Sequence, residues 1–271
     1  MPRPFLNLFM TADKSQPVDD IITAVPGEWR FDKKVAQSFD SHVRKSVPFY
    51  DEIQHLIVEM SEFFVRDNSS VFDIGASTGE TLYHLADKHR QKKNVRLFGI
   101  EQSFRMVEEA GSKLKDIPNI RLLHHNVQEY ARFDHADLIL ALYTLQFLNL
   151  EDRYELLAKI FRDLRIGGAF VIVEKVHAES AQAEDLWNEL HWDFKQRSGL
   201  SDDMILAKSR SLRGVLLPMT VLENIRMLEW AGFRRTDVFF KWLNWVGIIA
   251  IKTEPSPAPL GEDESIHEST K

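Results

Sequence analysis

Two patterns of hydrophobic positions follow one another along the chain. Between residues 28 and 65, large apolar side chains recur three or four positions apart, with a break at Pro48. This spacing predicts helices, because such positions share one helix face and proline interrupts a helix. From Val71 onward, apolar runs alternate with amphipathic stretches, and we expect strands at 71–74, 95–100, 119–123, 137–142 and 169–175 and helices at 79–90, 103–114 and 151–164. Alternation of this kind predicts a parallel, doubly wound sheet.

The pattern changes after residue 175. A stretch of about forty residues has helical spacing, with apolar positions at Leu186, Leu190, Phe194, Ile205 and Leu206. A helix at 218–230, ended by Gly232, precedes two apolar runs at 233–240 and 246–251, which Leu243 and Asn244 join as an antiparallel pair. The predicted fold class is therefore α/β: a doubly wound Rossmann-like sheet with a terminal antiparallel hairpin, an N-terminal helical cap and a helical insertion before the last helix.

These elements predict one domain with two extensions. We expect an N-terminal arm over residues 1–26, a folded domain over 27–253 and a disordered tail over 254–271, where Pro, Ser and Glu are frequent. The domain includes the helical cap at 27–66 and the helical insertion at 177–216. Inserted helices at such a place commonly cover an active site or form a dimer contact.

Composition and charge narrow the kind of partner. The 271 residues are 44% hydrophobic and 28% charged, with a formal net charge of −7. We expect a small-molecule substrate and no direct nucleic-acid contact, because phosphate backbones require a basic surface. The longest apolar run, 138–150, contains polar residues and is shorter than the ~20 residues that span a bilayer. The chain begins without a recognisable secretion signal, so we expect no membrane contact and a cytoplasmic location. Because the chain has no cysteine, disulfides and thiolate metal sites are excluded.

The stretch at 71–80 carries the strongest chemical signal. It is typical of a buried strand that enters a glycine turn and then a helix, with Asp73 near the strand end and the turn formed by Gly75, Ala76, Ser77 and Gly79. Glycine lets the backbone approach a ligand closely, and the first helical turn presents free N–H groups. A carboxylate here repels a pyrophosphate but accepts hydrogen bonds from an ammonium or from ribose hydroxyls. S-adenosylmethionine (SAM), which has a sulfonium and an amino group and no phosphate, fits better than NAD.

A second acidic residue follows the next predicted strand. Glu101 stands 22 positions after Gly79, where a carboxylate is the expected partner of a ribose diol, and we expect Gln102 beside it to contact the cofactor too. That spacing fits NAD and SAM alike. The loop favours SAM, because the dinucleotide fingerprint is G-x-G-x-x-G and this chain has G-x-x-x-G after an acid. A glycine turn that only connects a strand to a helix remains an alternative.

Through Asp73, Gly75, Gly79 and Glu101 the chain resembles the class I SAM-dependent methyltransferase superfamily. Within it, the chain is most similar to the carboxy-S-adenosylmethionine synthase family. That similarity covers residues 27–252 and is carried by Gly27-Glu28-Trp29-Arg30-Phe31-Asp32, Ser46-Val47-Pro48, Thr144-Leu145-Gln146-Phe147-Leu148, Glu174-Lys175, Asp193-Phe194-Lys195 and Ala231-Gly232-Phe233. Enzymes of that family take a carboxyl group from prephenate to make the carboxylated sulfonium used in tRNA wobble-uridine modification. The resemblance also implies a homodimer.

The resemblance assigns cofactor contacts residue by residue. It implies that Tyr50 lies over the cofactor, that Gly75 to Ser77 follow its methionine part, and that Glu101 binds the ribose, where the family usually has Asp. Asn126, with Val127 beside it, falls where an Asp normally meets the adenine amino group. An amide oxygen still accepts that hydrogen bond.

Two departures from the family concern the extra carboxylate of carboxy-SAM. The family has an asparagine where this chain has Leu142, and its carboxylate-binding arginine aligns with Ser209, although Arg210 lies one residue further on. Charge-assisted hydrogen bonds carry recognition of a buried carboxylate, so both changes weaken it. We therefore expect ordinary SAM as the cofactor, with carboxy-SAM as the alternative. We expect Leu142 to contact the cofactor and Arg210 to bind the substrate.

The leading hypothesis is a transferase that methylates a small-molecule acceptor with SAM. Methyl transfer from a sulfonium is an in-line displacement, so alignment is the protein's main contribution. The candidate catalytic residues are Tyr50, His191 and Asp193, of which the last two can take a proton from the acceptor. The alternatives are a carboxy-SAM synthase and a non-catalytic SAM-binding protein. Adjacent histidines at 124 and 125 point to opposite faces of a strand, so we expect no metal site.

Overall fold

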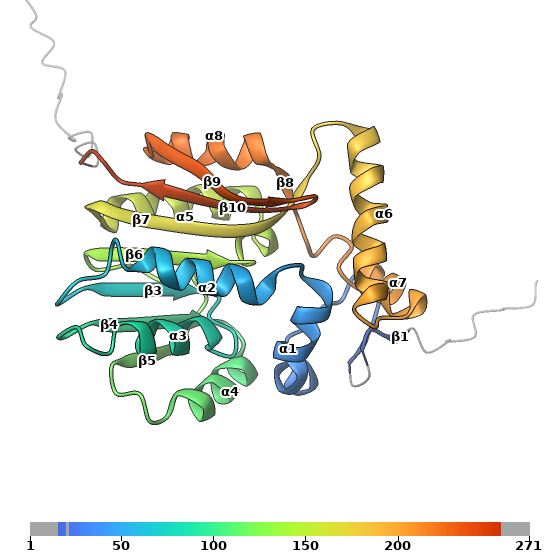
Figure 1. Cartoon of the computed structure of the whole chain (residues 1–271), viewed down its shortest axis with the longest axis horizontal. Coiled ribbons are helices and arrows are strands. Elements are labelled where there is room, and N and C mark those ends of the chain that lie inside the picture. The colour runs from blue at the N-terminus through green and yellow to red at the C-terminus, as the bar shows by residue number, and fades with distance from the viewer. Residues whose placement is uncertain (1–15, 20–21, 256–271) are drawn as a thin grey trace, which may run out of the picture.

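A computed structural model of the chain describes residues 16–19 and 22–255. Its centre is a sheet in the order β5-β4-β3-β6-β7-β10-β9 (Figure 1). The strands of this sheet are β3 (Ser70–Ile74), β4 (Arg96–Glu101), β5 (Ile120–His124), β6 (Ala136–Leu142), β7 (Leu164–His177), β9 (Arg235–Trp242) and β10 (Trp245–Ile251). The short strand β8 (Met219–Thr220) pairs with the end of β7, and β1 (Gln16–Pro17) pairs with β2 (Thr23–Ala24).

Strand directions confirm the predicted fold class. Strands β3 to β7 pair in parallel, whereas β10 runs antiparallel to both β7 and β9. Leu243 and Asn244 form the tight connection between the last two strands. Most of the predicted tail, from residue 256, and residues 1–15, 20 and 21 of the predicted arm lie outside the described residues.

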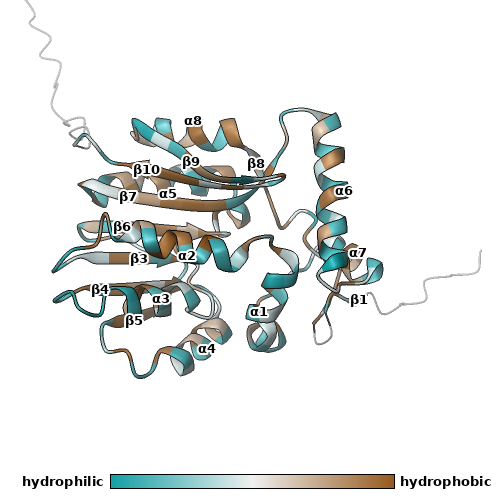
Figure 2. Ribbon diagram, viewed as in Figure 1, coloured by the Kyte–Doolittle hydropathy of each residue, from teal (hydrophilic) through white to brown (hydrophobic). Residues whose placement is uncertain are grey.

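Helices cover both faces of the sheet (Figure 1). They are α1 (Lys33–Ser46), α2 (Tyr50–Ser61), α3 (Glu80–Lys88), α4 (Phe104–Leu114), η1 (Leu145–Phe147), α5 (Leu150–Asp163), α6 (Ala181–Arg197), α7 (Asp202–Ser211) and α8 (Val221–Ala231). One core packs the sheet against α5 and α8, and the other packs it against α2, α3 and α4. All five residues of β3 are buried, as expected for a parallel strand covered on both sides, and Figure 2 shows hydrophobic residues along the strands.

Helices α1, α6 and α7 lie beyond one end of the sheet (Figure 1). Helix α1 starts at Lys33 because the Asp32 carboxylate accepts the Val35 N–H at 3.0 Å. The segment before it, which the hydrophobic spacing predicted to be helical, is not. Helix α6 does not bury its apolar positions as helical spacing predicts, since Leu186 is 59% and Leu190 42% exposed. Within the described part of the chain, no helix is long and apolar enough to cross a membrane.

Candidate functional site

A cavity of about 600 Å³ lies at the carboxyl ends of β3, β4, β6 and β7. Ligands of parallel α/β sheets bind at this edge. The wall away from the sheet comes from α1, α6 and α7. The lining includes most of the predicted cofactor residues, namely Tyr50, Asp73, Gly75, Ala76, Ser77, Glu101, Gln102, Asn126, Val127 and Leu142.

The two predicted acids come together in this cavity and are almost fully buried. Burial raises the pKa of Asp73 to about 8, and the neighbouring Glu101 carboxylate adds to the shift. Burial also raises the pKa of Glu101, although it accepts the Ser77 N–H at 3.0 Å and the Ser103 N–H at 2.7 Å. Adjacent buried carboxylates are unfavourable until a cation or hydroxyl donors reach them. SAM has an amino group, a sulfonium and ribose hydroxyls, so this acidic end of the cavity fits it.

The glycine turn after β3 holds the backbone close to its neighbours. Gly75 has φ +74°, and a Cβ there would lie 2.2 Å from Thr144 Oγ1. Gly79, the other predicted cofactor glycine, does not line the cavity. It also has positive φ, and a Cβ there would lie 2.6 Å from a Leu114 methyl. Gly79 is therefore needed for the start of α3 and its packing on α4.

Aromatic residues form the wall beside the turn. Tyr50 stacks on Tyr143 with ring centroids 5.8 Å apart, and Tyr143 meets the edge of Trp245 at 5.6 Å. Tyr143 has φ +61°, an uncommon backbone for a bulky residue. Burial raises the pKa of the Tyr50 hydroxyl, so this group keeps its proton at neutral pH and can donate a hydrogen bond to a ligand.

The structure does not support His191 as a base. Its ring is buried in the cavity wall, and burial followed by the charge of Lys195 lowers its pKa to about 2. Nε2 lies 3.1 Å from the Ser46 carbonyl, to which it donates, and Nδ1 lies 3.3 Å from the Asn244 amide nitrogen. Both ring nitrogens are engaged, so His191 is a structural residue.

Two further predicted residues lie elsewhere. Asp193 and Arg210 are exposed and do not line the cavity. Each stands two positions from a lining residue of the same helix, His191 and Lys208 respectively, and two positions along a helix turn a side chain about 200° away. The structure therefore gives no support to a catalytic Asp193 or a substrate-binding Arg210, whereas Ser209 and Arg213 line the cavity.

Sequence reasoning missed three lysines that line the same cavity as the acids. Lys175 at the end of β7, Lys195 on α6 and Lys208 on α7 all line the cavity. Burial lowers the pKa of Lys175. Burial, followed by the charge of Lys175, lowers the pKa of Lys195 to about 7, and burial, followed by the charge of Lys195, lowers that of Lys208 to about 7. Among the described residues, no carboxylate lies within salt-bridge distance of these three ammonium groups. We call them the lysine cluster, and its unpaired charge complements an anion.

Comparison with known proteins agrees with this geometry. The methyltransferase domain family matches residues 71–168. A carboxy-S-adenosyl-L-methionine synthase of Staphylococcus epidermidis is 42% identical over 228 residues, which cover 84% of this chain and 98% of that protein. A protein of the same name from Methylococcus capsulatus is 36% identical, covering 83% of this chain and 94% of its own length.

Solved structures agree at the level of the fold. The YcgJ protein of Bacillus subtilis has a TM-score of 0.56 at 16% identity, covering 76% of this chain and all of its own. Human N-acetylserotonin methyltransferase in complex with SAM has a TM-score of 0.57 at 14% identity, covering 82% of this chain and 56% of its own. The chain therefore belongs to the carboxy-S-adenosyl-L-methionine synthase family, within the class I SAM-dependent methyltransferase fold, and is a SAM-dependent transferase.

Proposed function

We propose that this chain makes carboxy-SAM from SAM and prephenate. The observation that carries the proposal is the lysine cluster, which faces the same cavity as the Asp73 and Glu101 carboxylates. The acids of the cavity thus suit a sulfonium cofactor, and its lysines suit an anion. Prephenate has two carboxylates, and half-buried ammonium groups with no carboxylate of the described chain within salt-bridge distance are the complement that such a molecule requires.

The lysine cluster also offsets the loss of the family's arginine. Ser209 stands at that position and lines the cavity, but a hydroxyl carries no charge. Lys208, the preceding residue, brings an ammonium to the same stretch of wall. A lysine lacks the rigid fork of arginine, so several lysines are needed for comparable binding of a carboxylate.

The chain's own residues then have distinct tasks. Asp73 and Glu101 would hold the polar groups of SAM. The sulfonium methyl of SAM would lose a proton and gain the CO₂ that prephenate releases, and prephenate would also lose hydroxide to give phenylpyruvate and, with that proton, water. The Tyr50 hydroxyl would donate a hydrogen bond beside the sulfonium methyl, and the aromatic wall of Tyr50, Tyr143 and Trp245 would keep water away. The lysine cluster would orient prephenate.

Mass spectrometry of the reaction products tests this proposal. After incubation of the protein with SAM and prephenate, we expect a product heavier than SAM by CO₂. Lys195→Met should lower its yield at limiting prephenate, whereas Lys88→Met, in an ion pair with Glu59 outside the cavity, should not. Absence of the heavier product with protein that binds SAM would refute the proposal.

Methylation of a small-molecule acceptor is the second candidate. Leu142 lines the cavity where the family has an asparagine and offers no donor to an added carboxylate. If this reading is correct, SAM with a metabolite extract gives S-adenosylhomocysteine, and prephenate has no effect. If neither product forms, the third reading, a non-catalytic SAM-binding protein, gains support.

A further inference from the structure

A buried polar contact links the N-terminal segment to the cavity wall. The Asp19 carboxylate lies 2.8 Å from His42 Nδ1, with the two residues 5% and 2% exposed. A carboxylate only accepts hydrogen bonds, so Nδ1 carries the proton. Groups buried to this degree must be paired, and the pair fixes both the orientation and the tautomer of the imidazole.

The other side of the imidazole faces Lys208. His42 Nε2 lies 2.5 Å from the Lys208 ammonium, and Ser46 Oγ lies 3.1 Å from it. Burial, followed by the charge of Lys208, lowers the pKa of His42 to about 3. The ring is therefore neutral at neutral pH, and Nε2 accepts a hydrogen bond from the ammonium. The ammonium also lies 5.4 Å from the ring centroid of Trp29.

We propose that Asp19 and His42 are positioning residues that hold the Lys208 ammonium in place to bind a carboxylate of the second substrate. The inference rests on the proposed function, because it takes prephenate as the molecule that Lys208 binds. A lysine side chain that nothing holds has a flexible four-carbon chain, so its ammonium group samples many positions. The relay from Asp19 through His42 restricts Lys208 to one of them, so the segment before α1 contributes to substrate recognition.

Charged groups face this site from several elements. The charge of Asp19 favours the ammonium form of Lys208, whereas burial and the other two lysines disfavour it. Loss of the Asp19 charge should therefore make Lys208 release its proton at lower pH. The groups around the relay are Asp19 in the N-terminal segment, His42, Lys45 and Ser46 on α1, Lys175 on β7 and Lys195 on α6.

The test is the KM for prephenate, measured with saturating SAM over about pH 6 to 9. We expect Asp19→Asn to raise KM about tenfold near pH 8 with a smaller change in kcat, and to move the alkaline limb of kcat/KM to lower pH. His42→Ala should raise KM similarly. His42→Gln should retain more affinity, because its amide both accepts and donates.

The controls separate this inference from the proposed function. Asp87→Asn removes a carboxylate from an exposed ion pair with Arg90 and should match the wild type. Calorimetric binding of SAM identifies the variants that are folded. If Asp19→Asn does not bind SAM, the inference is tested by comparing the KM for prephenate of His42→Gln with that of His42→Ala. If Lys208→Met raises KM but the Asp19 and His42 variants do not, the positioning inference is wrong and the proposed function stands. If Lys208→Met leaves KM unchanged, Lys208 does not bind prephenate and the positioning inference is wrong, whereas only the absence of a carboxylated product refutes the proposed function.

Discussion

At the residue scale, the protonation of Asp73 links the cavity to pH. Its pKa of about 8 in the ligand-free protein, caused by burial and then by Glu101, lies well above the ordinary value of 3.8. The folded state therefore binds the Asp73 proton more tightly than the unfolded state does. The stability that this proton contributes is present below about pH 4 and is lost as pH rises from about 4 to about 8. A bound amino group or hydroxyl donor favours the carboxylate instead, so SAM binding and proton release are coupled.

We expect SAM binding at pH 7 to release a proton from Asp73. Calorimetry in two buffers of different ionisation enthalpy measures the release, because the observed heat then differs between the buffers. Affinity should fall as pH is lowered below about 8. Asp73→Asn should bind more weakly and show no buffer dependence. A wild-type heat that is the same in both buffers would contradict the assignment.

Two glycines give a matched test of the turn. Gly75→Ala places a methyl group 2.2 Å from Thr144 Oγ1 at a residue with positive φ, so we expect lost SAM affinity and reduced stability. Gly111 lies within α4 with no atom within 4 Å of an added Cβ. Gly111→Ala should stabilise the protein by about 0.5–1 kcal/mol in urea unfolding, since alanine favours the helix. Equal effects of the two changes would argue against the tight turn.

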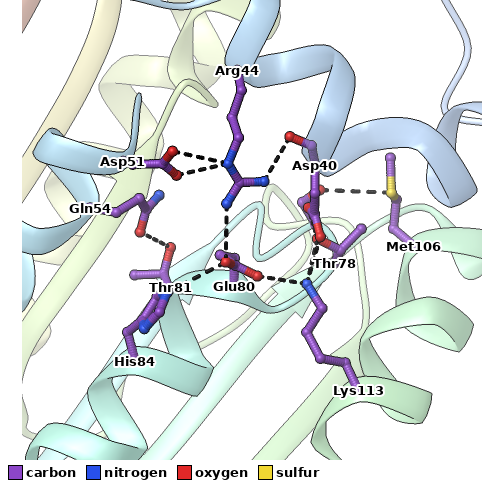
Figure 3. Close-up of polar contacts among 11 residues, drawn as sticks. Asp40, Arg44, Asp51, Gln54, Thr78, Glu80, Thr81, His84, Met106 and Lys113 are labelled. Atoms are coloured by element: carbon purple, nitrogen blue, oxygen red, sulfur yellow. Dashed lines mark hydrogen bonds and ion pairs between the residues drawn. The ribbon is translucent and has the colours of Figure 1, made fainter. Parts of the chain in front are cut away.

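At the scale of elements, polar contacts fasten α1 to the cofactor loop (Figure 3). Asp40 accepts hydrogen bonds from Thr78 Oγ1 at 2.6 Å and from Lys113 Nζ at 2.7 Å. Lys113 also pairs with Glu80 at 2.8 Å, and Arg44 reaches the same carboxylate at 3.3 Å. Because Thr78 and Glu80 line the cavity, the position of the cap and the shape of the SAM site depend on one another.

Lys113→Met should loosen this junction. It leaves Asp40 and Glu80 as neighbouring carboxylates, so we expect a loss of about 1 kcal/mol in unfolding free energy, moderated by solvent, together with weaker SAM binding. The matched change Lys88→Met removes a pair with the largely exposed Glu59 and should cost less than about 0.5 kcal/mol without affecting SAM. Urea unfolding measures the free energy of unfolding, and calorimetry measures the SAM affinity. Unchanged SAM affinity in Lys113→Met would show that the cap does not influence the SAM site.

At the scale of the whole molecule, local patterns predicted the sheet and one end of the cavity. The buried run of β3, the glycine turn and Glu101 occur close together in sequence, and parallel strands bring their ends to one edge. The lysine cluster was not predictable in this way, because Lys175, Lys195 and Lys208 come from three elements that meet only through tertiary packing. For the same reason, helical spacing alone did not indicate which of Lys208 and Arg210 faces inward.

The account as a whole requires one cavity that binds SAM through its acids and an anion through the lysine cluster. The most direct measurement is calorimetric titration of prephenate into protein saturated with S-adenosylhomocysteine, which lacks the methyl carbon and cannot react, for the wild type and for Lys175→Met/Lys195→Met. We predict binding to the wild type and at least tenfold weaker binding to the double variant, with SAM affinity retained. Equal affinity of prephenate for both proteins would contradict the account.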